Sequence, residues 1–116
     1  MEIADTTWKR FRGLMFRKKC KEILFILPKK SRVLASIHSF FVFFNFDVVW
    51  LDEKMRVVDL KENIKPFCIN ITPKKPAKYI LEMPAGEIKK RNLKPGKNLR
   101  WLKKVLEKHC EEKACI

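Results

Sequence analysis

This sequence of 116 residues contains no glutamine, and acidic residues are scarce, with 13 Asp and Glu against 27 Lys and Arg. The absence of glutamine beside abundant lysine is a bias of heat-adapted proteins with few thermolabile amides, and it favours a thermophilic source. A Ser-His-Asp order, a phosphate-binding loop and a dinucleotide fingerprint are also missing. These absences exclude the enzyme classes that depend on such motifs, while the net charge of +14 directs attention to anionic partners.

Lysine and arginine are also absent from the longest apolar stretch of the chain, residues 33–51. Its length is close to the ~20 residues with which a helix crosses a bilayer, so a membrane span is one interpretation. Phe, Val and Ile dominate, which favours strands, and His38, Asn45 and Asp47 are costly in lipid. We therefore expect two core strands joined by a turn at 45–47, the first of them covered on both faces.

The length suits one domain with its own hydrophobic core. No apolar segment follows the first residue, so we expect no signal peptide and a cytoplasmic protein. The spacing of the four cysteines matches no zinc pattern, and we expect free thiols at Cys20, Cys68, Cys110 and Cys115. We expect no metal and no cofactor, and the sequence leaves the oligomeric state undetermined.

Short apolar segments between turn residues predict a mainly β fold. We expect a helix that is capped by Asp5 or Thr6, runs to Arg12 and ends at Gly13. Pro28 is expected to stop the first of the strands, which we place at residues 23–27, 37–44, 48–51, 56–60 and 78–83.

A C-terminal helix is expected from about residue 102, because apolar side chains recur there on one side. The predicted architecture is a small antiparallel β-barrel or sandwich with a short N-terminal helix and a C-terminal helix. We expect residues 1–101 to form a single β-rich domain and residues 102–116 a helical extension.

Two motifs carry a resemblance to a known family. Residues 10–17, RFRGLMFR, resemble the opening signature of uncharacterised protein family 0127, also called domain of unknown function 192. Residues 77–86, AKYILEMPAG, with LKPG behind them, resemble the family's closing motif, and the segment IHSFF at 37–41 is similar to the archaeal branch. The resemblance covers residues 4–101. It implies a mostly β fold with motif glycines at Gly13, Gly86 and Gly96, and it implies no established activity.

Asp47 lies in very apolar surroundings, on the strand face that it shares with Val49 and Leu51. A lone buried carboxylate would take up a proton, so it needs a partner. Arg10 or Arg12 can supply a bidentate guanidinium, which would clamp the N-terminal helix to the sheet. The alternative is an anion or polar-ligand pocket built from Arg10, Arg17, Asp47 and Glu82, and of the two we favour the clamp.

Glu82 shares its strand face with Lys78 and Ile80, and we expect a half-exposed acid paired with lysine. If the two strands are neighbours, Asp47 and Glu82 are an alternative acid–base pair for a small-molecule enzyme. His38 is expected as a core histidine. His109 with Cys110 and Cys115 is weak support for a metal site.

The basic residues suggest a nucleic-acid surface, because residues 9–32 hold ten Lys or Arg and a single acid. Trp8, Phe11 and Phe16 interleave with them and would stack on bases if exposed. The alternatives are a soluble, ion-paired surface and an anionic membrane surface. The candidate nucleic-acid residues are Lys9, Lys18, Lys19, Lys29, Lys30 and Arg32.

The sequence therefore predicts a non-catalytic binding or interaction domain whose ligand is unknown. Nucleic-acid binding by the basic surface is the first alternative. A small-molecule enzyme that uses Asp47 and Glu82 is the second.

Overall fold

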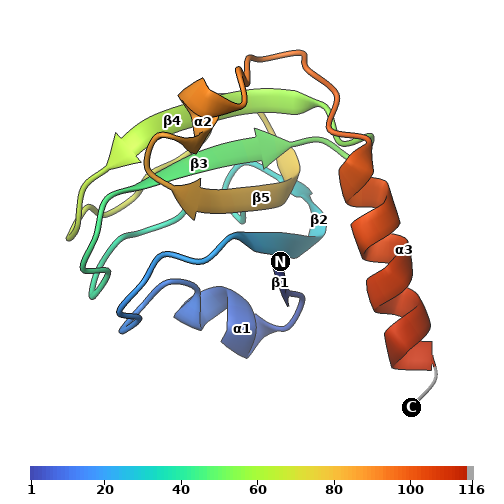
Figure 1. Cartoon of the computed structure of the whole chain (residues 1–116), viewed down its shortest axis with the longest axis horizontal. Coiled ribbons are helices and arrows are strands. Elements are labelled where there is room, and N and C mark those ends of the chain that lie inside the picture. Colours follow the sequence, from blue (N-terminus) through green and yellow to red (C-terminus); the bar gives the residue numbers. More distant parts are fainter. Residues whose placement is uncertain (115–116) are drawn as a thin grey trace.

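The computed structural model describes residues 1–114 and shows an open five-stranded sheet flanked by helices and long loops (Figure 1). The strand order is β1-β2-β5-β3-β4; β1 pairs parallel to β2 and the other pairs are antiparallel. The elements are β1 (Glu2–Ala4), α1 (Thr7–Arg12), β2 (Ile23–Ser31), β3 (Phe46–Leu51), β4 (Val57–Ile64), β5 (Ala77–Pro84), α2 (Glu87–Lys90) and α3 (Trp101–Ala114).

The mainly β fold is confirmed, but the barrel is wrong. A barrel requires the two edge strands to pair, and here β1 and β4 stay at opposite edges of the sheet. The sheet is also mixed rather than antiparallel throughout, because the short strand β1, which the sequence pattern did not reveal, runs parallel to β2. Three residues carry too little alternation to identify a strand.

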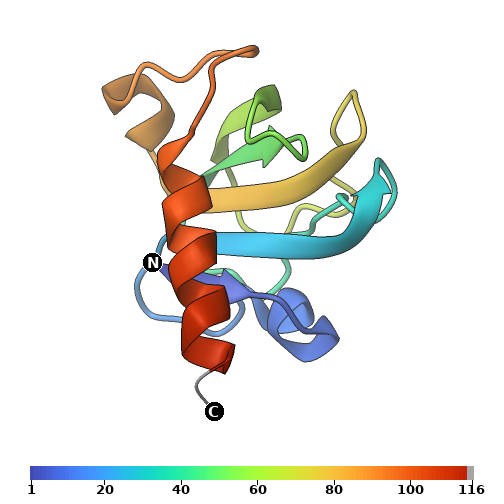
Figure 2. The same cartoon turned by 90° about the vertical axis from the view of Figure 1, so that its right-hand side faces the viewer.

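Both faces of the sheet are buried, as strand β3 illustrates. Phe46, Val48 and Trp50 pack into one hydrophobic cluster, while Val49 and Leu51 pack into another. The first cluster, here called the loop-side core, also holds Leu14 and Met15 after α1 together with residues of the loops 32–45 and 65–76. The second, the helix-side core, holds Ile88 of α2 and Leu102 of α3. Figure 2 shows α3 crossing in front of the ends of β2 and β5.

The N-terminal helix is built as its sequence predicts. The side chain of Thr6 accepts a hydrogen bond from the backbone N–H of Lys9 at 3.1 Å and so caps α1. Gly13 ends the helix with φ of 43°, and its N–H donates to the carbonyl of Lys9. A Cβ on Gly13 would lie 3.2 Å from the ring of Phe25, a tight contact, and the positive φ would strain any other side chain, so this position favours glycine.

Strand β2 does not stop at Pro28 as expected but continues to Ser31. Its pairing with β5 is shifted between Ile26 and Ser31, and an irregularity of this kind tolerates a proline that cannot donate to the ladder. The hairpin of β3 and β4 is confirmed. Asp52 closes its turn by accepting hydrogen bonds from the N–H groups of Lys54 and Arg56, both at 2.9 Å.

The expected strand at 37–44 and the expected turn at 45–47 are wrong. Residues 32–45 form a long loop whose only ladder contact within residues 1–114 is a bridge between Ile37 and Ile71, and β3 begins at Phe46. Ala35 and Val42 of this loop point into the core, while Phe41 and Phe43 are exposed. A run that is apolar at every position carries no period to separate a strand from a folded-back loop, so tertiary contacts decide.

Within residues 1–114, no helix combines the length and the apolar character that crossing a membrane requires. Helix α3 contacts the helix-side core through Leu102, Val105 and Leu106. The division into a domain 1–101 and an extension 102–116 stays a prediction.

Candidate functional site: a pocket over Glu82

A pocket of about 220 Å³ lies between α1, the loop 32–45 and the loop side of the sheet. Residues 10–15 form one wall, and Leu34, Ser36 and His38 of the loop form another. Ile80 and Glu82 of β5 line it from the sheet. The imidazole of His38 stands between the rings of Phe11 and Phe40, with centroids 6.4 and 6.0 Å away, and its Nδ1 accepts a hydrogen bond from the N–H of Phe40.

Glu82 is the buried acid of this pocket, with 4% of its surface exposed. No group within residues 1–114 donates a hydrogen bond to its carboxyl. Burial raises the pKa of Glu82 to about 8, and the positive charge of Arg17 opposes that rise only in part. At neutral pH the group is therefore mainly a neutral carboxylic acid, which can donate one hydrogen bond and accept others.

The expected partner of Glu82 is engaged elsewhere, because the ammonium of Lys78 donates to the carbonyl of Leu27. Cys20 packs beside the loop-side core. Burial raises the pKa of its thiol to about 12, with smaller contributions from the charges of Glu82 and Asp47. A thiol in that state is not a nucleophile at neutral pH.

Asp47 is completely buried, and its partners are backbone amides rather than an arginine. Its Oδ1 accepts a hydrogen bond from the N–H of Asn63 at 2.8 Å. Its Oδ2 accepts from Gly86 at 3.1 Å and from Ile88 at 3.0 Å. The carboxylate thus joins β3 to the end of β4 and to the start of α2. The prediction that Arg10 or Arg12 pairs with Asp47 is wrong.

Asp47 and Glu82 lie on neighbouring strands but on opposite faces of the sheet. The register pairs Val48 with Glu82 and Asp47 with Met83, and side chains alternate along a strand. Met83 packs into the helix-side core, whereas Glu82 lines the pocket on the loop side. The two carboxylates therefore do not face one another, and an acid–base pair is not formed.

The two sequence motifs that resemble the family meet at this pocket. Residues 10–15 of the opening motif line it, and the closing motif supplies Ile80 and Glu82. The family model of DUF192, described as "Uncharacterized ACR", matches residues 1–101. The chain belongs to this family.

The DUF192 chain has archaeal relatives. It is 45% identical over 102 residues to the UPF0127 protein of Thermococcus kodakarensis, an alignment that covers 87% of this chain and 64% of that protein. It is also 45% identical over 103 residues to the UPF0127 protein of Pyrococcus horikoshii, covering 87% and 86% of the two chains. The chain thus spans slightly less than two thirds of the Thermococcus relative, and neither relative has an assigned activity.

Two solved structures share the fold of this DUF192 chain. A protein of unknown function from Novosphingobium aromaticivorans is 22% identical with a TM-score of 0.75, covering 82% of this chain and 69% of that one. A protein of Sinorhizobium meliloti that was proposed to be a transcription regulator is 23% identical with a TM-score of 0.76, covering 82% and 75%. At these identities the likeness shows the fold alone.

The arginines of the opening motif hold the DUF192 domain together at its N-terminus. Arg10 donates from Nη1 to the carbonyls of Asp5 and Ile26, both at 3.1 Å. Arg17 donates from Nε to the carbonyl of Gly13 at 2.8 Å and pairs with both oxygens of the Glu2 carboxylate. The hydrogen bond from Arg17 lowers the pKa of Glu2. Arg12 is exposed and lines the pocket.

The motif glycines all have positive φ, and Gly86 and Gly96 lie in turns beside α2. Gly86, at φ of 96°, brings its N–H onto Asp47 at the start of α2. The family motif therefore contributes to both faces of the sheet.

The six basic residues expected to bind nucleic acid do not form one surface. Lys18 and Lys19 precede β2 and Lys29 and Lys30 lie at its far end, and nine strand residues span ~30 Å. Several are also occupied: Lys9 lies 3.7 Å from Asp5, Lys30 lies 3.3 Å from Glu53, and Arg32 donates to the carbonyl of Pro73.

Within residues 1–114, no three His, Cys, Asp or Glu side chains gather as a metal site would require. His109 instead contacts Asp5 Oδ2 at 2.9 Å, which joins α3 to the segment before α1. The third residue of the suggested metal group, Cys115, lies outside the described residues.

The sequence missed Phe11, His38 and Cys20 as neighbours of the site. No local signal identifies them, because they come from three segments that only the fold brings together. Phe11 alone carries a hint in the sequence, because it interleaves with the basic residues as a candidate for stacking on bases.

Proposed function

We propose that this domain binds a small molecule with a mainly apolar body and one amide or carbonyl group, held in the pocket over Glu82. The observation that carries the proposal is Glu82, a residue with 4% of its surface exposed, which lines the pocket and whose carboxyl accepts no hydrogen bond from any group within residues 1–114. Natural proteins rarely leave such a group unpaired, because its desolvation costs about 1–3 kcal/mol. A ligand that pairs with the acid recovers that cost.

The remaining lining suits a small ligand. Apolar side chains cover most of the wall, among them Leu14, Phe25 and Ile80. A dry cavity of ~150 Å³ accommodates benzene, so about 220 Å³ has room for roughly ten non-hydrogen atoms. A neutral carboxylic acid pairs with an amide through two hydrogen bonds, one donated by each partner.

Binding fits the geometry better than catalysis. The acid–base hypothesis needs Asp47 and Glu82 on one substrate, and the sheet separates them. The thiol of Cys20 is held protonated. Glu82 alone supplies recognition.

The test uses three probes with one hydrocarbon chain and different head groups: hexanamide, hexylamine and hexanoate. We expect hexanamide to shift the backbone NMR signals of residues around the pocket, including Gly13 and His38, with a dissociation constant on the order of millimolar. Binding should weaken as the pH rises above about 8, where Glu82 loses the proton that it donates.

The variant Glu82→Leu should abolish this binding, and Glu62→Leu is the matched control because Glu62 is exposed on β4. Equal hexanamide affinity in the Glu82 variant and the wild type would contradict the proposal. So would the failure of hexanamide to shift any pocket signal at its solubility limit, or a tighter binding of hexylamine than of hexanamide.

A further inference from the structure

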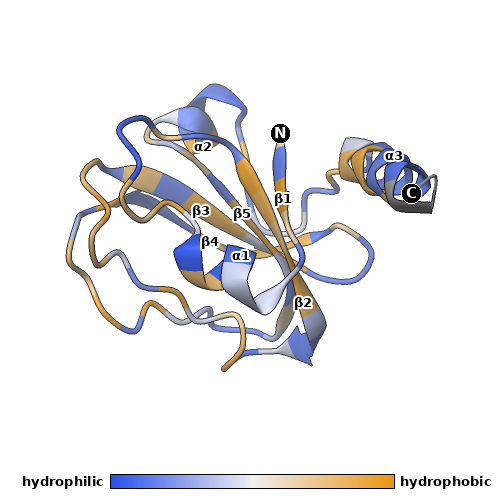
Figure 3. Cartoon of the chain, turned by 90° about the horizontal axis from the view of Figure 1, so that it is seen from below, coloured by the Kyte–Doolittle hydropathy of each residue, from blue (hydrophilic) through white to orange (hydrophobic). Residues whose placement is uncertain are grey.

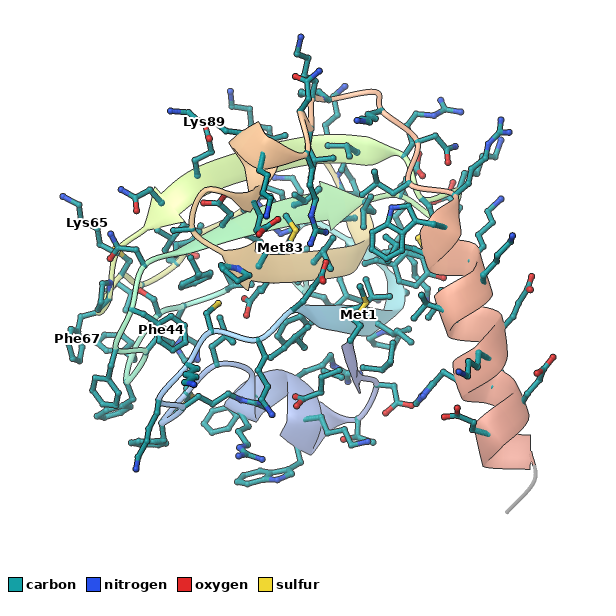
Figure 4. All side chains as sticks on the ribbon, in the orientation of Figure 1. Met1, Phe44, Lys65, Phe67, Met83 and Lys89 are labelled. Carbon is teal, nitrogen blue, oxygen red and sulfur yellow. The ribbon has the colours of Figure 1, made fainter. Side chains whose placement is uncertain are left out.

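Four exposed phenylalanines form a cluster at one end of the molecule. Phe16, Phe41, Phe43 and Phe67, here called the phenylalanine cluster, have between 47% and 65% of their surface exposed. The rings of Phe16 and Phe41 stack with centroids 5.0 Å apart, and Phe43 lies 6.5 Å from Phe16 and 6.4 Å from Phe67. Phe67 is labelled at this end in Figure 4, and Figure 3 shows hydrophobic colour along the long loops as well as in the sheet. Exposed apolar groups that touch one another indicate an interaction surface.

The backbone at this cluster is strained. Phe16, Phe41 and Phe67 have φ of 60°, 58° and 63°, a conformation that bulky residues rarely adopt. Glycine or asparagine would occupy such positions at lower cost. The loops hold the strained residues through backbone hydrogen bonds from Phe16 to Phe41 and from Phe67 to Ser39, both 2.8 Å long. Strain of this kind concentrates at functional surfaces, which supports a role for the rings beyond packing.

The segments that build this end carry an excess of positive charge, of which Lys9 and Arg17 are paired with Asp5 and Glu2. Residues 6–21, 37–46 and 65–71 contain no Asp or Glu, whereas the first contains seven Lys or Arg and the third contains one. Lys18 and Lys19 follow Phe16, and Lys65 precedes Phe67. All three are exposed, and none of them forms an ion pair within residues 1–114. Figure 4 places Lys65 at the same end as Phe67. A partner of this surface must therefore be negatively charged.

We propose that the phenylalanine cluster docks the domain onto an anionic lipid membrane surface, with the rings in the interfacial layer and the lysines on the headgroups. Anionic bilayers attract lysine at about 1 kcal/mol per residue, and apolar side chains add affinity by partitioning below the headgroups. Both requirements are met by the same three loops.

Two other occupants match the observations less well. A second copy of this chain would oppose one acid-free basic end to another, and like charges across an interface are repulsive. Single-stranded nucleic acid stacks its bases on open aromatic faces, whereas Phe16 and Phe41 cover one another. Ile69, two residues after Phe67 and 65% exposed, is aliphatic and suits lipid rather than bases.

Vesicle co-sedimentation tests the proposal with the double variant Phe41→Asn/Phe67→Asn. Asparagine tolerates positive φ, so the variant should melt at the wild-type temperature or higher, which separates loss of binding from loss of folding. We expect the wild type to bind phosphatidylglycerol vesicles but not phosphatidylcholine vesicles, and the variant to bind the former at least about tenfold more weakly. The control Trp101→Asn removes an exposed aromatic side chain at the start of α3 and should bind as the wild type does.

Charge reversal at two pairs of lysines separates a local site from net charge. Lys18→Glu/Lys19→Glu should weaken vesicle binding about tenfold or more. Lys103→Glu/Lys104→Glu on α3 gives the protein the same net charge and should retain most of the vesicle binding. Equal losses in the two variants would overturn the proposal. It is also overturned if phosphatidylglycerol vesicles do not bind, if the asparagine variant loses binding to a single-stranded oligonucleotide instead, or if the wild type dimerises through this end.

Discussion

Replacing Asp47 by Asn is expected to lower the free energy of unfolding by about 2–5 kcal/mol. The carboxylate accepts three backbone hydrogen bonds, one on Oδ1 and two on Oδ2, at a completely buried position. An amide offers one acceptor oxygen and directs an NH₂ group at the remaining donors, so at least one buried N–H loses its partner. Because a domain is stable by only about 5–15 kcal/mol, the change should be visible in urea unfolding.

Asp52→Asn is the matched control for this prediction. Asp52 also accepts two backbone hydrogen bonds through its carboxylate, but in an exposed hairpin turn where water replaces a lost partner. We expect a loss of about 1 kcal/mol or less there. Similar losses in free energy of unfolding in the two variants would contradict the prediction that the hydrogen bonds of Asp47 hold β3, β4 and α2 together.

Replacing Glu82 by Leu is expected to have the opposite sign and to stabilise the domain by about 3 kcal/mol at neutral pH. Leucine has a similar volume and removes a buried carboxyl that lacks a partner within residues 1–114. The gain in stability should accompany a loss of hexanamide binding, because a residue that serves binding is often kept at a cost in stability.

The pH dependence gives this prediction a second readout. The pKa of Glu82 is raised from 4.5 to about 8 in the folded protein, so between these values the folded state holds a proton that the unfolded state has released. The contribution of this proton to the free energy of unfolding is complete below pH 4.5 and is lost as the pH rises through about 8. Between these values the free energy of unfolding falls by up to about 1.4 kcal/mol per pH unit.

Glu82→Leu should remove that slope, so the stability difference between variant and wild type should grow from pH 4.5 towards pH 8. Urea unfolding at a series of pH values measures it, with Glu62→Leu as the control at an exposed position. A variant less stable than the wild type at every pH would mean that Glu82 has a stabilising partner.

Local signals were sufficient for several elements. A cap at Asp5 or Thr6, a helix end at Gly13, a hairpin turn around Asp52 and a strand at 78–83 were predictable from side chains that act within a few residues. The structure has Thr6 as the cap and the strand at Ala77–Pro84. The two family motifs could also be recognised from the sequence. The loop at 32–45 was not, because its unbroken apolar composition matches a buried strand, and only the exposed rings of Phe41 and Phe43 distinguish it.

The sequence by itself determined the family, the mainly β fold, the basic character and the burial of an acid at Asp47. Tertiary structure alone decided which acid serves which purpose. Alternation along a strand shows that two residues share a face, but it cannot relate the faces of two different strands. The pairing of Val48 with Glu82 does so, and it places Asp47 among backbone amides and Glu82 in the pocket. Partners for buried charge are set by such long-range contacts. For the same reason the phenylalanine cluster is apparent only in the structure and could not be found from the composition.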